Sequence, residues 1–237
     1  MLHFSEASKA SLESSCMPSN GPTYAAKAII EFVGTFFLVG VIGLAIAQPN
    51  EGGNFDAFAI AGALTALIYM GGPISGAHYN PVVTLVFAAT RRMASGLAVI
   101  YILAQLAGSL VAAGLVSFIL PGEAFVAVDV IPGIEYSVKL AIMEFFFTFL
   151  LVFTILNVAA RRSTQGNSYY GLAIGLVVLA GALAVGPISG AVFNPAVAVG
   201  LSAMEASPWA LLLWYFGAQI AGALVAAGVF EQTSPDA

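Results

Sequence analysis

The sequence predicts an all-α membrane protein in which six transmembrane helices and two re-entrant half-helices form two inverted three-helix repeats. Three observations carry this prediction. Only 8% of the 237 residues are charged and 60% are hydrophobic, which is too little charge to cover a soluble surface of this size. Most apolar stretches of the chain have a length close to that of a membrane-spanning helix, about 20 residues. The second half of the chain also repeats the first.

Four apolar stretches each match one membrane crossing, at about 26–47, 94–120, 138–160 and 208–230. Two further stretches, 57–90 and 163–204, contain no Lys, Arg, Asp or Glu and are too long for one crossing. We interpret each of them as a full helix, then a Gly-Pro-Ile-Ser-Gly turn signal at 72–76 or 186–190, then about nine more helical residues. Such a segment is roughly 13 Å long and ends about halfway through the roughly 30 Å hydrocarbon core.

The two halves of the chain correspond closely. AQLAGSLVAAGL at 104–115 and AQIAGALVAAGV at 218–229 are 114 residues apart, as are Asn80 and Asn194. Each repeat holds three full spans, an odd number, so the second repeat must be inverted in the membrane. We expect repeat one over about 24–120 and repeat two over about 136–230, within a single domain over 24–237. Residues 1–23 lack a continuous apolar stretch and are expected to be a mobile cytoplasmic tail, not a signal peptide.

Charged residues gather at the ends of the predicted spans. One side carries the basic residues Lys9, Lys27, Arg91, Arg92, Arg161 and Arg162. The other side carries Lys139 and the acidic residues Glu51, Asp56, Glu123, Asp129 and Glu135. The positive-inside rule therefore places both termini in the cytoplasm and predicts that the two half-helices meet tip to tip near the midplane. The net charge of −5 resides in loops and the C-terminal tail, so it does not suggest a nucleic-acid partner.

Two Asn-Pro pairs lie at membrane depth, Asn80-Pro81 and Asn194-Pro195. Asn is a preferred N-cap and Pro is favoured in the first helical turn, so each pair predicts the start of a half-helix. Capping uses the amide oxygen and leaves the NH₂ donors free to face a lumen. Two facing helix N-termini also create a positive focus of about half a charge each, which repels protons and other cations. Irregular backbone at this depth is tolerated only inside protein or along a water-filled cavity.

On these residues the chain resembles the aquaporin/glycerol-facilitator (major intrinsic protein) family from Ala25 to Phe230. SGAHYNPVVT and SGAVFNPAV are similar to the two signature loops of that family, whose pore signature here is Asn80, Pro81, Val82, Asn194, Pro195 and Ala196. The resemblance implies a passive channel for water and small neutral solutes, not an enzyme, with no cofactor. It also implies a homotetramer in the lipid bilayer of a plasma or inner membrane. Val82 replaces the usual alanine at a position that normally packs away from the solute, so we expect a small effect.

The resemblance further implies an outer selectivity filter formed by Ile60, Ala182, Ala191 and Val197. The last position is usually an arginine, which narrows the pore, donates hydrogen bonds and repels cations. Valine does none of these, so the expected filter is wide and apolar and would pass glycerol, urea and neutral metalloid acids besides water. A neighbouring side chain could instead fill the gap, but no Arg or Lys lies within ten residues of Val197.

Glu31 and Glu144 are predicted to lie inside membrane helices, where ionisable residues are functional candidates. One interpretation is a proton-coupled secondary transporter that uses these two acids. The other is that they are loop-supporting carboxylates, each accepting hydrogen bonds from the N–H groups of the nearby half-helix loop, and their placement once per repeat favours this role. A non-conducting membrane scaffold is a third possible function.

Three further features of the sequence concern a histidine, metal binding and helix packing. His78 lies in the first signature loop and is a candidate for lining the cytoplasmic vestibule or for bonding its own loop. With two His and one Cys, Cys16, no metal site can be assembled. The small-residue pairs Gly108…Ala112 and Gly222…Ala226 predict close helix crossings.

Overall fold

The structure is a computed structural model that describes residues 21–47, 55–120 and 133–234. Predictions that concern residues 1–20, Glu51, Glu123 and Asp129 lie outside these ranges. The first repeat comprises α2 (Tyr24–Ile46), α3 (Phe55–Ser75), α4 (Pro81–Ala89) and α5 (Ser95–Ile119). The second comprises α6 (Ile134–Ile155), α7 (Tyr170–Ser189), α8 (Pro195–Ala203) and α9 (Leu212–Thr233). Three short segments complete the described helices: a π-helical turn over Leu156–Ala160 and 3₁₀ turns over Arg162–Thr164 and Trp209–Leu211.

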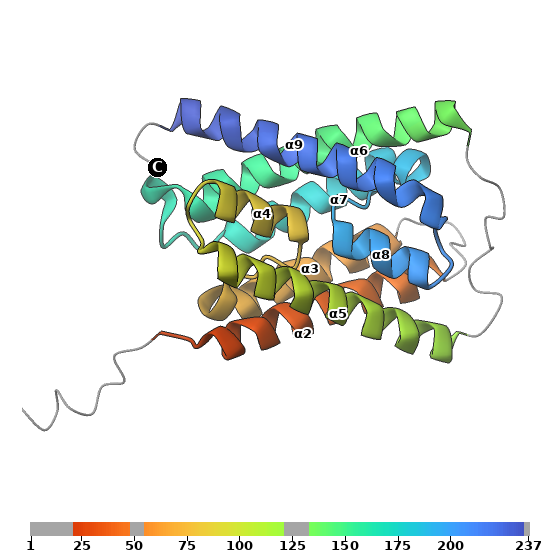
Figure 1. Cartoon of the computed structure of the whole chain (residues 1–237), viewed down its shortest axis with the longest axis horizontal. Coiled ribbons are helices and arrows are strands. Elements are labelled where there is room, and N and C mark those ends of the chain that lie inside the picture. Colours follow the sequence, from red (N-terminus) through yellow and green to blue (C-terminus); the bar gives the residue numbers. More distant parts are fainter. Residues whose placement is uncertain (1–20, 48–54, 121–132, 235–237) are drawn as a thin grey trace, which may run out of the picture.

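Within the described ranges, six helices are long and apolar enough to cross a membrane, which confirms the six predicted spans. The two remaining α-helices, α4 and α8, have nine residues each, the length expected of half-helices. They lie between the long helices of the two repeats (Figure 1). The described chain begins and ends on the same side of the bundle (Figure 1). This is a multi-pass membrane protein.

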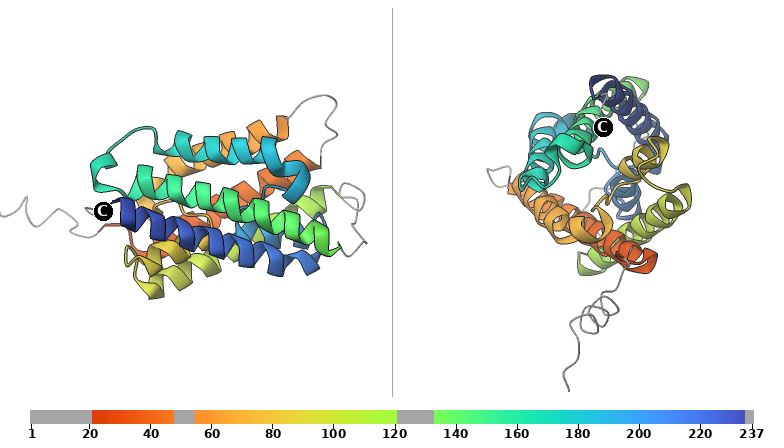
Figure 2. Two further views of the ribbon diagram at one scale, coloured as in Figure 1. Left: turned by 90° about the horizontal axis from the view of Figure 1, so that it is seen from above. Right: turned by 90° about the vertical axis from the view of Figure 1, so that its left-hand side faces the viewer.

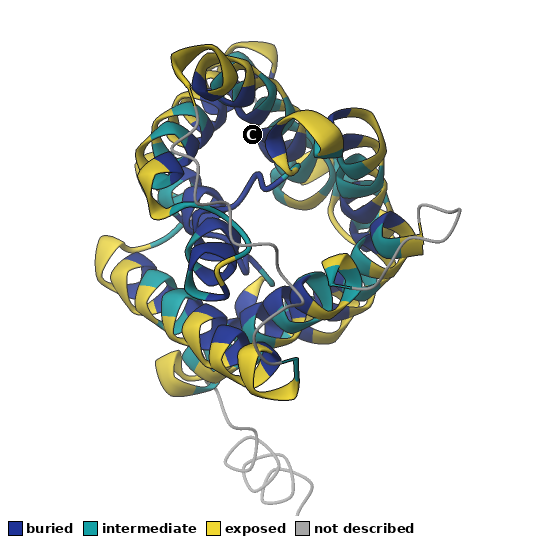
Figure 3. Ribbon diagram, turned by 90° about the vertical axis from the view of Figure 1, so that its right-hand side faces the viewer, coloured by how far each residue is buried: buried dark blue, intermediate teal, exposed yellow. Residues whose placement is uncertain are grey.

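The two repeats pack in the same way. Helix α2 packs on α5 and α3 in the first repeat, and α6 packs on α9 and α7 in the second, while α3 and α7 join the repeats. Seen end on, the long helices form a ring (Figure 2). Exposed residues lie mainly on the outside of this ring and buried residues on its inner side (Figure 3). A membrane protein shows this distribution because lipid, and not water, covers its outer apolar surface.

The structure corrects one detail of the predicted turns. Pro73 and Pro187 stay inside α3 and α7, which end at Ser75 and Ser189. The helical bonds resume after each proline, since Gly76 N–H donates to Gly72 O (3.1 Å) and Gly190 N–H to Gly186 O (2.9 Å). A transmembrane helix tolerates the bond lost at proline because neighbouring groups satisfy the freed carbonyl. The chain leaves each helix after the serine, at Gly76 and Gly190, whose φ angles are 89° and 82°.

Candidate pore

Each half-helix starts at the predicted asparagine. Asn80 and Asn194 have extended backbone and cap α4 and α8, with proline in the first turn. Asn80 Oδ1 accepts from Val82 N (3.0 Å), and Asn194 Oδ1 accepts from Ala196 N (2.9 Å). These bonds satisfy backbone donors that have no partner within the helix.

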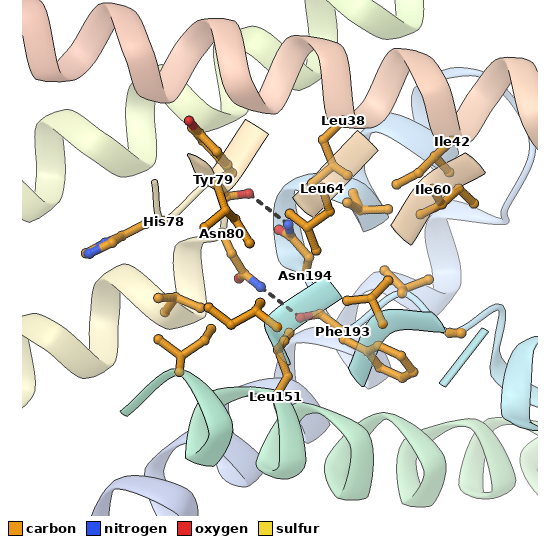
Figure 4. A pocket seen from close by; sticks show the side chains of 18 of the residues that line it. Leu38, Ile42, Ile60, Leu64, His78, Tyr79, Asn80, Leu151, Phe193 and Asn194 are labelled. Carbon is orange, nitrogen blue, oxygen red and sulfur yellow. Dashed lines mark hydrogen bonds between the residues drawn. The ribbon is translucent and has the colours of Figure 1, made fainter. Parts of the chain in front are cut away.

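The two half-helix starts are also joined across the centre of the bundle. Asn80 Nδ2 donates to Phe193 O at 2.9 Å, and Asn194 Nδ2 donates to Tyr79 O at 2.8 Å (Figure 4). The expectation that both NH₂ groups are wholly free is therefore wrong, because each uses one hydrogen to hold the opposite loop. One N–H of each amide remains for a molecule in the cavity that both asparagines line.

Two fully buried carboxylates hold the loops in front of the half-helices. Glu31 accepts from Ser75 Oγ (2.7 Å), His78 N (3.0 Å), Tyr79 N (2.7 Å) and Gln105 Nε2 (2.8 Å). Glu144 accepts the corresponding four bonds, from Ser189 Oγ (2.8 Å), Val192 N (2.9 Å), Phe193 N (2.7 Å) and Gln219 Nε2 (2.8 Å). Both side chains are 0% exposed, and neither lines the cavity.

The serine and glutamine partners of these carboxylates were not predicted from the sequence. Their signal was present in the repeated segments, since Gln105 and Gln219 fall in the AQLAG and AQIAG segments, and Ser75 and Ser189 in the two GPISG segments. Two tyrosines that fix the ends of α3 and α7 were not predicted either. Tyr101 Oη donates to Ser75 O and Tyr215 Oη to Ser189 O, each at 2.7 Å. Polar residues at matching positions of both repeats, within apolar helices, are therefore a signal of hydrogen bonds that support the loops.

The backbone of each loop turns its N–H groups toward the protein. Ala77, Tyr79, Ala191 and Phe193 adopt left-handed φ angles between 47° and 52°, a conformation that costs about 1–3 kcal/mol per residue and needs outside support. The carboxylates and the serine hydroxyls supply that support. Within the described parts of the chain, the carbonyls of 76–78 and 190–192 accept no hydrogen bond, and these residues line the cavity. They therefore offer a polar track along a largely apolar wall.

The cavity has a volume of about 990 Å³ and extends along the bundle. Thr164–Asn167 line one end, and Asp56 and Ala206–Pro208 line the other. In between it passes the two asparagines, with His78 on one side of this pair and Ile42 and Ile60 on the other (Figure 4). Leu38, Leu64 and Leu151 contribute apolar wall near the centre (Figure 4).

All four residues of the expected outer filter line this one cavity: Ile60, Ala182, Ala191 and Val197. Val197 is 3% exposed, and among the described residues no lysine or arginine lines the cavity wall. His78 also lines it, with Nδ1 3.1 Å from Thr84 Oγ1 and its ring packed on Phe87. Val82, by contrast, does not line the cavity and is 1% exposed. The described residues include no group of three His, Cys, Asp or Glu side chains able to hold a metal ion.

The arrangement of six spans around a lumen that passes two facing half-helix tips defines a membrane channel. Comparison with known proteins agrees. Residues 18–230 match the sequence model of the family described as Major intrinsic protein. Nodulin-26 of Glycine max is 34% identical over 211 residues, which cover 86% of this chain and 76% of that protein. Aquaporin NIP1-1 of Oryza sativa subsp. japonica is 35% identical over 210 residues, covering 86% of this chain and 73% of that protein.

A solved structure supports the fold. The X-ray structure of the aquaglyceroporin from Plasmodium falciparum superposes with a TM-score of 0.74 at 20% identity, covering 89% of this chain and 96% of that chain. The chain belongs to the major intrinsic protein family, whose members are membrane channels for water and small solutes and not enzymes. The resemblance noted from the sequence is thus confirmed.

Proposed function

We propose that this protein is a passive channel whose wide, apolar, arginine-free filter passes neutral solutes larger than water, such as glycerol, urea and undissociated metalloid acids. The observation that carries the proposal is that Val197 lines the same cavity as Ile60, Ala182 and Ala191. A charged side chain at position 197 would narrow the pore. An apolar ring lets a polyol keep its carbon face against the wall. The free carbonyls of 190–192 accept from its hydroxyl groups.

Exclusion of cations then depends on the centre of the pore. The N-terminal ends of α4 and α8 meet there, and each contributes a positive field of about half a charge. Desolvating an ion beside an apolar ring adds a second barrier. Because the positive field attracts anions, we also propose a slight leak of anions.

We further propose that residues 24–237 form a single channel domain that assembles as a homotetramer in a plasma or inner membrane, with both termini in the cytoplasm. The charges at the two ends of the bundle support this orientation. Arg92 and Arg161 both lie over the ring of Phe230 near the end of α9, and Lys27 is in the first turn of α2 on the same side. Asp56 and Glu135 lie in the first turns of α3 and α6, on the other side.

The coupled-transporter alternative is less well supported. A proton-carrying acid must meet the transported solute or water. Glu31 and Glu144 are each surrounded by four protein donors and lie off the cavity wall. The other alternative, a non-conducting membrane scaffold, would not raise the osmotic permeability of vesicles that contain it.

The test compares vesicles that contain native protein with vesicles that contain the Val197→Arg variant. Water flux is measured from shrinking in an impermeant osmolyte, and glycerol and urea flux from swelling in a gradient of each solute. Arginine would add a fixed charge and five donors at this position. We expect Val197→Arg to reduce glycerol and urea flux about tenfold or more while water flux falls much less. The matched control is Val197→Met, which adds length without charge or donors and should have an intermediate effect. A native pore that already excludes glycerol, or an unchanged water-to-glycerol ratio in Val197→Arg, would contradict the proposal.

A further inference from the structure

The internal repeat provides a counterpart for each residue of the outer filter. The two repeats are in register at Ser75 and Ser189, which accept the same tyrosine bond, and at Asn80 and Asn194, which cap the half-helices. Counting from these anchors, the filter residues Ile60, Ala182, Ala191 and Val197 correspond to Ile174, Ile68, Ala77 and Val83. We call the first set the outer ring and the second set the inner ring.

All four residues of the inner ring line the same cavity as the outer ring. Since the repeats are inverted, the two rings lie at matching distances on opposite sides of the asparagine pair. Three positions are identical between the rings: Ile pairs with Ile, Ala with Ala, and Val with Val. The rings differ only where Ile68 in α3 corresponds to Ala182 in α7, so the inner ring carries a sec-butyl group where the outer ring has a methyl.

Burial agrees with this difference in size. Ile68, Val83 and Ile174 of the inner ring are 4%, 2% and 5% exposed, and its fourth residue, Ala77, is partly exposed. In the outer ring only Val197 is buried, and the other three residues are partly exposed. The inner ring is therefore the more buried of the two sets of side chains.

Neighbouring positions add to the asymmetry. His78 and Phe87 line the cavity near the inner ring, where the corresponding residues of the other repeat are Val192 and Leu201. Two pairs go the other way. Leu64 faces the outer side and exceeds its counterpart Val178 by one methylene. Counting from the pair Glu31 and Glu144, which are 113 residues apart, Ile46 at the outer entrance corresponds to Ala159. Neither pair belongs to a ring, so the inner ring keeps the bulkier set of side chains.

We propose that the inner ring, and Ile68 in particular, sets the upper size of the solutes that pass. The inference rests on the proposed channel function and on the absence of arginine from the outer ring. When two constrictions lie in series, the narrower one limits the flux. Because the outer ring has Val197 and no arginine, the inner ring has the bulkier side chains. Selectivity by size would then reside on the His78 side of the asparagine pair.

The test exchanges the one residue by which the rings differ. Purified native protein, Ile68→Ala, Ala182→Ile and the double variant would be reconstituted in vesicles. Swelling would be measured with water, glycerol and the four-carbon polyol erythritol. We expect Ile68→Ala to raise glycerol and erythritol flux about fivefold, with water flux changing less, because it removes the narrowest contact. Ala182→Ile should lower these fluxes by about twofold at most, since it only makes the outer ring equal to the native inner ring.

The double variant moves the larger side chain from the inner to the outer ring and should return polyol flux to within about twofold of native. Ile68→Val, which keeps the β-branched shape, should give a smaller rise and provides a readout if Ile68→Ala reconstitutes poorly. If the native pore passes glycerol and neither Ile68 variant changes polyol flux, while Ala182→Ile reduces it strongly, the inference is overturned and the proposed function stands. If the native pore excludes glycerol but Ile68→Ala admits it, the proposed solute range is wrong and the inner ring is confirmed as the limit.

Discussion

Gly108 of α5 lies directly against the backbone of Phe32 in α2: a Cβ atom at Gly108 would be 2.4 Å from Phe32 O. Gly222 of α9 has the same relationship to Phe145 of α6, with 2.3 Å between a built Cβ and Phe145 O. The two helix pairs therefore cross with backbone in contact with backbone, as the small-residue spacing in the sequence predicts. In a membrane such contacts hold helices together without help from the hydrophobic effect, because lipid is as apolar as the side chains.

Gly108→Ala and Gly222→Ala should each destabilise the protein, because the new methyl group meets a backbone oxygen that cannot move aside without separating the helices. Overpacking of this kind costs about 1–3 kcal/mol. The matched controls are Gly114→Ala in α5 and Gly228→Ala in α9, where nothing lies within 4 Å of the built Cβ. These should be neutral or more stable, since alanine is the better helix former. Thermal unfolding in detergent provides the comparison, and equal midpoints for the two groups of variants would contradict the close-packing argument.

Glu31→Gln and Glu144→Gln should reduce folding yield and stability more than they alter the pH dependence of flux. Each carboxylate satisfies four donors with two oxygens. Glutamine replaces one oxygen with an NH₂ group, so two buried donors lose their acceptor, at roughly 1–3 kcal/mol each. The control is Glu135→Gln, since Glu135 is 82% exposed in a surface pair with Lys139 that is worth less than about 1 kcal/mol.

The measurements are the yield of monodisperse protein, the unfolding midpoint, and solute flux in vesicles with and without a pH gradient. A Glu31 or Glu144 variant that folds as well as native protein but loses a proton-coupled flux would overturn the loop-supporting role and favour the transporter interpretation.

The sequence predicted the six spans and two half-helices because each rests on a local signal that the fold keeps. Uncharged length defines the spans, and Asn-Pro defines the half-helix starts at Pro81 and Pro195. The predicted turns at 72–76 and 186–190 were placed a few residues early. The reason is that a Gly-Pro pair usually ends a helix in water, whereas in this bundle α3 and α7 continue to Ser75 and Ser189.

The sequence could not reveal the bonds that cross between repeats. Asn80 and Phe193 are far apart in the chain, and no local pattern signals that an asparagine amide will donate to a carbonyl of the other repeat. The partners of Glu31 and Glu144 are similar, because serine and glutamine in an apolar helix show only that some polar contact exists. The tertiary packing of the helices determines which hydrogen bond is formed.

Val82→Ala should lower stability but leave the flux per folded protein unchanged. Val82 is buried with Val86, Val152 and Ala223, where α4 packs on α6 and α9, and it does not line the cavity. Removing two methyl groups from this cluster should cost about 1–2 kcal/mol. The experiment compares unfolding midpoints and water and glycerol flux per reconstituted protein. A changed water-to-glycerol ratio would show that this signature position reaches the pore after all.

Asn80→Asp should make the pore leak protons, although it preserves the start of α4. Aspartate is as good an N-cap as asparagine, so the bond to Val82 N can persist. Its carboxylate cannot donate to Phe193 O, however, and it adds a negative charge where the ends of α4 and α8 together supply a positive field of about one charge. Cation exclusion should weaken as that field is cancelled.

Asn80→Ala separates the charge from the lost hydrogen bond. It removes both the cap and the donor without adding charge, and should therefore be the less stable of the two variants, by about 1 kcal/mol for the cap, yet the tighter to protons. The measurement is the decay of a pH gradient across vesicles that contain each protein, recorded with an entrapped pH-sensitive dye and normalised to water flux. We expect the rate of decay to rise in the order native, Asn80→Ala, Asn80→Asp. If Asn80→Asp vesicles hold the gradient as well as native vesicles do, the field of the half-helix tips does not exclude protons, and the barrier must arise from desolvation at the apolar rings.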